Sequence, residues 1–435
     1  MSGKKVLLVY PYFYTDAKKS QIFPPVGISI LSALLKKNGI DVMILDCTFQ
    51  TTEGAIKKAQ ECKPDITGIY VMTTLAKNAL MLLGKLRELN PESIYVAGGP
   101  LPTLYPEKFA RIFDYVFRGE AAKSFPAFCG DYFNAADRVE FTKNIDPSMY
   151  PGIYSFKTGF IESPAAHLTK EEIDACPLPD RESFDHKKYQ EMNLGYSGKK
   201  KAFIMMSYGC PFSCDFCSKP IFGSEVRFRS LDRVFEEIRD IISYGYDELW
   251  IADDFFTYDV QFLENFCDRL IDEGRPISWS CLSRVDCVDD RIAKVMKSAG
   301  CSRVYLGIES GNDDVLKLMN KKINLATVVK GVEIFKNNGI DCVGFFIVGY
   351  PGETVETIEE TFAFALSLGL DHISFNVPYP LPGSKLYERV SDISDDDWNM
   401  EKETRFLYKS EFDEKWLERR IQETYEAFDR LNIIR

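Results

Sequence analysis

The sequence has few histidines, few basic side chains relative to acidic ones, and no long apolar run. Its three histidines, His167, His186 and His372, are too few and too scattered for a histidine-rich metal site. The 53 basic residues against 65 acidic ones give a formal net charge of −12, which argues against nucleic acid as a partner because phosphate contacts need a basic face. No window approaches eighteen uninterrupted apolar residues, so we expect no membrane span.

The N-terminal stretch MSGKKVLLVYPYF also lacks the features of a secretion signal. Pro11 breaks its apolar run, and no small-residue cleavage site follows. We therefore expect a first strand here and a cytoplasmic protein. Since disulfides are rare in that compartment, the twelve cysteines are better candidates for metal ligation than for a disulfide framework.

What the chain does contain is ample material for packed cores, with 45% hydrophobic and 13% aromatic residues over 435 positions. Short apolar runs at residues 6–9, 42–45, 66–71 and 94–97 alternate with helical patterns at 29–37, 52–61 and 76–89. This alternation predicts an α/β domain over residues 1–140, a doubly wound Rossmann-like parallel sheet. Ligands of such sheets bind beyond the carboxyl ends of the strands.

The periodicity fades over residues 141–200, where prolines recur at Pro147, Pro151, Pro164, Pro177 and Pro179. We expect an irregular, proline-rich linker with few regular elements there. A second series of strands follows at 202–207, 248–252, 277–281, 303–308, 341–347 and 372–377. Six strands at this regularity predict a partial parallel βα barrel over residues 201–390. We expect residues 391–435 to form a C-terminal helical region, with a terminal helix at 414–431.

The strongest chemical motif is CPFSCDFC, which directly follows the first barrel strand and contains Cys210, Cys214 and Cys217. Thiolates in a tight loop suit an iron-sulfur cluster or zinc, and three without a fourth leave one metal position open. Structural zinc would need a fourth ligand, and no histidine has zinc-finger spacing to this loop. Buried core cysteines are the remaining alternative, which Gly209 and Pro211 disfavour.

Further motifs follow the later strands in a fixed order: RFRS at 227–230, WIADDFFT at 250–257, Arg284 in SRVD, GIES at 307–310 and GFFIVGYPGE at 344–353. Together with the cysteine loop they resemble the radical S-adenosylmethionine superfamily. The resemblance implies that the three cysteines hold a 4Fe-4S cluster whose open iron binds S-adenosylmethionine, and that reductive cleavage yields a 5′-deoxyadenosyl radical.

The resemblance also implies a set of S-adenosylmethionine contacts. Glu309 would accept a hydrogen bond from the ribose or the amino group, Arg284 would pair with the carboxylate, and Phe216 would contact adenine. The set is Phe216, Asp253, Arg284, Gly307, Glu309, Ser310, Gly349 and Pro351. The alternatives are an ordinary ion pair for Glu309 and Arg284, and a turn cap for Asp253. No catalytic acid or base can be identified.

The first domain, placed before this barrel, resembles that of the cobalamin-binding subclass of the same superfamily. Glycines at strand ends let the backbone approach a large flat ligand, although they also suit turns in an empty domain. The implied cobalamin contacts are Pro25, Gly27, Thr73, Thr74, Gly98, Gly99, Pro100, Gly119 and Glu120. The DxHxxG signature is absent and no histidine precedes His167, so a bound corrinoid would receive no imidazole from this domain.

With both cofactors, the resemblance implies a methyltransferase that acts on an unactivated carbon or on phosphorus of a small or medium substrate. Two molecules of S-adenosylmethionine would be used per turnover, and flavodoxin or ferredoxin would supply electrons. One alternative is a non-methylating radical reaction such as ring formation, dehydration or epimerisation. A non-catalytic corrinoid or iron-sulfur carrier is a third, which Glu309 and Arg284 disfavour.

Overall fold

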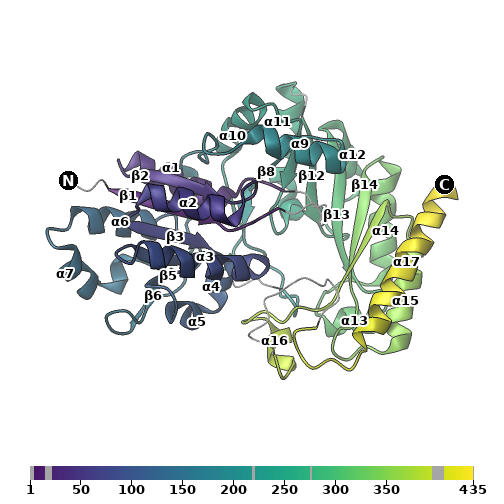
Figure 1. Cartoon of the computed structure of the whole chain (residues 1–435). Helices are drawn as coiled ribbons and strands as arrows, with labels where there is room; N and C mark the ends of the chain where they lie inside the picture. The colour runs from purple at the N-terminus through teal and green to yellow at the C-terminus, as the bar shows by residue number, and fades with distance from the viewer. Residues whose placement is uncertain (1–3, 15–21, 218–220, 275–276, 394–405, 435) are drawn as a thin grey trace. The chain divides into compact units, whose positions relative to one another are not determined.

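The computed structural model describes residues 4–14, 22–217, 221–274, 277–393 and 406–434 (Figure 1). The chain divides into two compact units, one formed by Met1–Lys200 with Asp232–Ile238 and the other by Lys201–Leu231 with Arg239–Arg435. Among the described residues, no helix combines the length and the hydropathy that a membrane span requires.

The first unit is built on a parallel sheet, as the alternating pattern predicts. The order of its strands is β2-β1-β3-β4-β5-β6-β7, and the first five run parallel. These five are β1 (Lys5–Tyr10), β2 (Asp41–Asp46), β3 (Ile66–Tyr70), β4 (Ile94–Gly98) and β5 (Tyr115–Phe117). The helices between and after them are α1 (Val26–Lys37), α2 (Thr52–Cys62), α3 (Ala76–Leu89), α4 (Pro100–Leu104), α5 (Pro106–Ala110) and α6 (Ser124–Asn134). The α/β fold class is thereby confirmed.

Residues 141–200 are more regular than we expected from their prolines. Two short strands, β6 (Ile153–Ser155) and β7 (Ile161–Glu162), extend the first sheet in antiparallel fashion from β5. The helices of this region are α7 (Arg138–Lys143), α8 (Lys170–Ala175) and α9 (His186–Ser197). Ile153 and Ile161 belong to the hydrophobic core of the first unit, so the segment is part of that unit and not an irregular linker. Strands of three and two residues are too short to show a period-2 pattern.

The second unit contains the six-stranded parallel sheet that the sequence predicts. Its order is β15-β14-β13-β12-β11-β8, so the end strands each have one neighbour in this sheet and the barrel stays open. The strands are β8 (Lys201–Ile204), β11 (Glu248–Ile251), β12 (Ser278–Ser283), β13 (Cys301–Glu309), β14 (Asp341–Ile347) and β15 (His372–Asn376). The connecting helices are α10 (Leu231–Ser243), α11 (Val260–Asp272), α12 (Asp290–Ser298), α13 (Asp313–Leu318), α14 (Leu325–Asn337) and α15 (Val355–Ser367).

A long terminal helix, α17 (Glu414–Ile434), covers the β15 end of this sheet (Figure 1). Arg420 makes two hydrogen bonds to the carboxylate of Glu359 on α15. The hydroxyl of Tyr425 accepts a hydrogen bond from the backbone N–H of Phe375 on β15 at 3.0 Å. Because β15 is an edge strand with unpaired backbone groups, this contact protects the edge.

Candidate functional site

The cysteine loop lies beyond the carboxyl end of β8, between the two short strands β9 (Ser207–Tyr208) and β10 (Arg227–Phe228), which pair in antiparallel fashion. Gly209 has a φ of +89°, and a Cβ there would lie 2.2 Å from the carbonyl oxygen of Glu225. Only glycine therefore fits the turn that starts the loop. Cys210, Cys214 and Cys217 are all half-buried and none forms a disulfide.

The back of the loop is fixed at Asp215. Its backbone N–H donates to the carbonyl of Met319, and its own carbonyl accepts from the N–H of Leu386 on α16 (Lys385–Arg389). Its carboxylate is only 2% exposed and lies 2.7 Å from the guanidinium of Arg389. The Asn320 side chain adds a 2.7 Å hydrogen bond to the carbonyl of Ser213. Two parts of the second unit therefore hold the cysteine loop in place. One is the segment that follows α13, and the other is helix α16.

The donor set fits an iron-sulfur cluster. Its three ligands are all soft thiols carried by one loop. In a 4Fe-4S cluster each thiolate binds a different iron. Three soft thiols on one loop suit that arrangement.

Glu309, at the end of β13, forms a buried ion pair that the sequence did not reveal. Its carboxylate oxygen Oε1 lies 2.6 Å from Nζ of Lys321, and both residues are 6% exposed. Glu309 has a φ of +73°, an uncommon and costly conformation for a residue with a side chain. A Cβ at Gly307 would lie 2.6 Å from Oε1 and 2.8 Å from Nζ, so glycine makes room for the pair.

Lys321 lies twelve residues beyond Glu309 and outside every motif. The residues on either side of it, Asn320 and Lys322, both have positive φ. Burial raises the pKa of the Cys214 thiol, while the charges of Lys321 and Arg284 act to lower it. Two cations thus face the cysteine loop, of which sequence reasoning identified one.

Arg284 follows β12 and is held by its own chain. Its Nε and Nη2 atoms each donate to the Asp286 carboxylate at 2.9 Å, and Nη2 also donates to the carbonyl of Lys321. The guanidinium lies 3.9 Å above the ring of Phe212. Arg284 therefore does form an ordinary ion pair, which was the alternative to a cofactor contact. Its buried Nη1 atom, however, has no hydrogen-bond partner among the described residues. One donor remains to bind an anionic group.

Asp253 is fully buried at the end of β11 and fixes the chain that leads to the cysteine loop. Its carboxylate accepts hydrogen bonds from the backbone N–H of Met206 at 2.7 Å and from the hydroxyl of Ser207 at 2.6 Å. It therefore does not cap the turn that follows it. Burial raises the pKa of this carboxyl to about 7.

The turn after β14 is packed by the chain itself. Gly349 has a φ of +82°, and a Cβ there would lie 2.6 Å from the ring of Phe406. The resemblance places Gly349 among the S-adenosylmethionine contacts, but the ring of Phe406 fills the space on its Cβ side. Pro351 lies in the same turn, where burial raises the pKa of Glu353 to about 7.

Two further predicted contacts have partners inside the second unit. The Ser310 hydroxyl lies 3.1 Å from that of Thr361. Phe216 packs against the cluster of Val315, Met319, Tyr350 and Leu386. The structure thus brings Glu309 and Arg284 around the cysteine loop and gives Ser310 and Gly349 packing roles.

Most of the predicted cobalamin contacts lie at the carboxyl edge of the first sheet. Thr73 and Thr74 form a 3-10 turn after β3. Gly98 ends β4, and Gly99 and Pro100 follow it. Pro25 and exposed Gly27 lie at the start of α1. Gly99 has a φ of +106°, and a Cβ there would lie 2.7 Å from the carbonyl oxygen of Val71.

Gly119 and Glu120 have a different role. A Cβ at Gly119 would lie 2.3 Å from the carbonyl oxygen of Ala166. The Glu120 carboxylate accepts a 2.8 Å hydrogen bond from the N–H of Leu168. These two residues hold the segment 166–168 against the sheet, so packing explains them without a ligand.

Sequence reasoning missed a tyrosine cluster at the same edge. The rings of Tyr10 and Tyr70, at the ends of β1 and β3, lie 5.8 Å apart. The hydroxyl of Tyr189 on α9 donates to the Asp46 carboxylate at 2.9 Å. Burial raises the pKa of Tyr70 to about 12 and that of Tyr10 still further. Scattered tyrosines form no motif, so only the fold brings them together.

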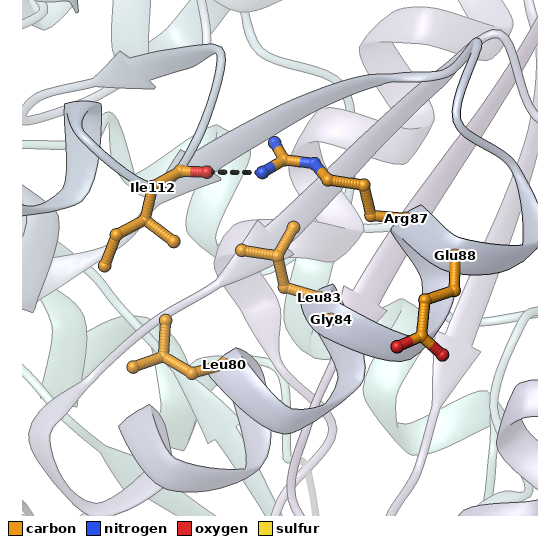
Figure 2. A pocket seen from close by; sticks show the side chains of 6 residues that line it. All are labelled: Leu80, Leu83, Gly84, Arg87, Glu88 and Ile112. Carbon is orange, nitrogen blue, oxygen red and sulfur yellow. Dashed lines mark hydrogen bonds between the residues drawn. The ribbon is translucent and has the colours of Figure 1, made fainter.

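A surface hollow of about 440 Å³ lies between α3 and Ile112, which follows α5 (Figure 2). Its lining is Leu80, Leu83, Gly84, Arg87, Glu88 and Ile112, with Arg87 donating to the carbonyl of Ile112 at 2.8 Å. The hollow extends to the last turn of α3. Because α3 starts near the carboxyl edge of the sheet and runs back from it, this last turn lies away from that edge. It contains none of the predicted site residues.

Comparisons with known proteins agree with this geometry. Residues 204–365 match the family model of the radical SAM superfamily, and residues 16–129 match that of the B12 binding domain. The chain belongs to the radical S-adenosylmethionine superfamily, and within it to the enzymes that carry a cobalamin-binding domain. It is an enzyme whose cofactors are a 4Fe-4S cluster, S-adenosylmethionine and cobalamin, and a small-molecule substrate is consistent with this class.

Individual relatives extend the match over most of the chain. An uncharacterized methyltransferase of Pyrococcus horikoshii is 31% identical over 399 residues, which cover 89% of this chain and 83% of that protein. The anaerobic magnesium-protoporphyrin IX monomethyl ester cyclase of Rubrivivax gelatinosus is 28% identical and covers 89% and 70%. The solved structure of the radical S-adenosylmethionine methyltransferase TsrM from Kitasatospora setae, with cobalamin and cluster bound, has a TM-score of 0.72 at 19% identity, covering 88% and 74%.

Proposed function

We propose that this enzyme transfers a methyl group to an unactivated carbon or to phosphorus in a small or medium molecule. The observation that carries the proposal is the presence in one chain of a cysteine loop faced by buried charges and of a cobalamin-binding domain. The Pyrococcus relative is named a methyltransferase, which supports the same reaction class.

In this proposal Cys210, Cys214 and Cys217 are the cluster ligands. The cofactors supply an electron for cleavage of S-adenosylmethionine and a carrier for its methyl group. S-adenosylmethionine presents a carboxylate and an ammonium group. The spare Nη1 donor of Arg284 suits the carboxylate, and Glu309 suits the ammonium group or the ribose.

The corrinoid would bind at the carboxyl edge of the first sheet, over Pro25, Gly27, Thr73, Thr74, Gly98, Gly99 and Pro100. Backbone amides at helix starts and threonine hydroxyls suit its amide and phosphate groups. No histidine precedes His167, so this domain offers no imidazole.

The test uses protein purified anaerobically and reconstituted with iron, sulfide and hydroxocobalamin. Metal analysis and the visible spectrum should give about four irons and one corrinoid per chain. Methyl-labelled S-adenosylmethionine, a reductant and a small-molecule extract are then added. Label in a product, with both 5′-deoxyadenosine and S-adenosylhomocysteine formed, supports methyl transfer. Cys214→Ala should abolish 5′-deoxyadenosine, which checks that the radical site is the source.

A second candidate is ring formation without methyl transfer. The observation that favours it is the Rubrivivax relative, which is named a cyclase. This reaction predicts 5′-deoxyadenosine without S-adenosylhomocysteine and no label in the product, so the same experiment separates the two.

We also propose that the electron comes from flavodoxin or ferredoxin. Such acidic donors need a local basic surface on a chain whose net charge is −12. Lys385 and Arg389 on α16 approach Asp215 of the cysteine loop at 3.7 and 2.7 Å, and their side chains are 63% and 38% exposed. They offer positive charge next to the loop that holds the cluster.

A further inference from the structure

The two faces of the six-stranded sheet in the second unit differ in burial. Residues on one face, such as Leu249, Val304 and Phe346, are fully buried. On the other face Ser280 and Val343 are buried, but one residue on each of five strands is half-buried; these are Phe203, Trp250, Leu282, Tyr305 and Phe345. In a closed eight-stranded barrel this inner face would be filled by layers of side chains. With six strands and open ends, it keeps partial access to solvent.

This inner face carries an aromatic band, defined here as Trp250, Tyr305 and Phe345. The ring centroids of Trp250 and Tyr305 are 4.5 Å apart in an edge-to-face arrangement, and those of Tyr305 and Phe345 are 5.8 Å apart and stacked. The three residues come from β11, β13 and β14. Because the two centroid distances share Tyr305, the centroids of the outer two rings lie no more than about 10 Å apart across the sheet.

The band is continuous with the candidate site. Phe345 pairs in register with Gly307, the glycine that makes room for the Glu309–Lys321 pair. On β12, Leu282 of the same face precedes Arg284 by two residues. A substrate must lie beside the bound S-adenosylmethionine for its atoms to react, so its binding surface has to adjoin these residues.

We propose that the aromatic band binds the substrate and that the substrate contains a planar, conjugated, multi-ring system. Barrel interiors are usually filled with Val, Ile and Leu, which would serve an aliphatic substrate equally well. Aromatic side chains add a geometric preference for other π systems, because ring faces and edges attract one another. The width of the band suits several rings and exceeds the need of a single small ring. This inference rests on the proposed function, which requires a substrate at this end of the barrel.

The test measures binding of two probes to the reconstituted holoenzyme by equilibrium dialysis. Protoporphyrin IX is planar and conjugated, whereas cholate is a carboxylate with a saturated ring system. The enzyme is first saturated with hydroxocobalamin, so that the porphyrin does not occupy the corrinoid site. We expect protoporphyrin IX to bind at least tenfold more tightly than cholate. Trp250→Leu should weaken porphyrin binding about tenfold, equivalent to about 1.4 kcal/mol.

Two further variants control for folding and for non-specific binding. Trp250→Phe retains a ring and should recover most of the affinity that Trp250→Leu loses. Trp416→Leu changes a half-buried tryptophan on α17 and should leave porphyrin binding unchanged. Should Trp250→Leu fail to fold, as judged by circular dichroism, Phe345→Leu takes its place with the same expected loss.

Equal affinity for the two probes, or equal losses in Trp250→Leu and Trp416→Leu, would overturn the inference. Neither result would affect the proposed methyl transfer, which the label experiment tests separately. Conversely, absence of label transfer with selective porphyrin binding would overturn the proposed function and leave the substrate class standing.

Discussion

Replacement of Lys321 by methionine should strongly destabilise the second unit. The change keeps the length of the side chain but leaves the Glu309 carboxylate buried without its counter-charge. Both side chains of this pair are 8% exposed, so solvent cannot compensate the lost contact. Removal of one partner of a buried ion pair costs roughly 3–5 kcal/mol. For a domain of this size that loss lowers the melting temperature by roughly 10 °C.

A double-mutant cycle isolates the part of this stability loss that comes from the ion pair itself. Glu309→Gln together with Lys321→Met leaves no buried charge, and exchange of a whole buried pair for neutral groups is often close to neutral. We expect the double variant to recover at least about 2 kcal/mol relative to Lys321→Met alone. Gly307→Ala breaks the same pair by another route, because its Cβ would lie 2.6 Å from Oε1 of Glu309.

The assay is thermal unfolding of cluster-free protein followed by tryptophan fluorescence. All four tryptophans lie after residue 200, so the signal reports on the second unit alone. Circular dichroism of the whole chain gives the first unit's transition as an internal control. A melting temperature within 2 °C of wild type for Lys321→Met, or a double variant no more stable than the single one, would refute the reasoning.

Three further predictions concern other parts of the site. Because burial raises the pKa of Asp253 to about 7, the folded protein holds a proton between about pH 4 and 7 that the unfolded chain releases, so stability falls as pH rises through that window. Asp253→Asn should flatten this dependence in melting scans from pH 5 to 8; an unchanged slope would contradict it. Gly349→Ala introduces a Cβ 2.6 Å from Phe406 at a position with left-handed backbone. It should lower the free energy of unfolding by about 2 kcal/mol, measured by tryptophan fluorescence. An unchanged free energy of unfolding would show that the turn adapts. Lys385→Glu should lower several-fold the ratio of flavodoxin-driven to dithionite-driven 5′-deoxyadenosine formation, and a constant ratio would place the donor elsewhere.

The architecture was predictable because strand and helix periods are local properties of the sequence. The strand predicted at 341–347 is observed as Asp341–Ile347, and the helix predicted at 76–89 as Ala76–Leu89. The terminal helix begins at Glu414 as predicted and ends three residues later than expected. The segment 141–200 was misjudged because β6 and β7 owe their existence to β5, a partner that no local pattern reveals.

The site was only partly predictable for the same reason. The cysteine spacing and the GIES motif are local, and they pointed to the loop and to Glu309. Lys321 lies in no motif, and its role arises from a turn that brings it back to Glu309. The glycines misled in the other direction, because a glycine in a strand-end motif looks the same whether the space beside it holds a ligand or, as at Gly119, a neighbouring backbone.

Backbone strain distinguishes Glu309 from these glycines. Gly99, Gly209 and Gly349 all have positive φ at strand ends or loops near them, where glycine adopts the conformation without cost. Glu309 has the same kind of conformation with a side chain, which costs about 1–2 kcal/mol, and its carboxylate is buried as well. Glycine at this position together with an uncharged residue in place of Lys321 would relieve the strain and remove both buried charges, so stability does not explain the pair. A need for a fixed carboxylate beside the cysteine loop does explain it, since strained residues persist where function requires their side chains.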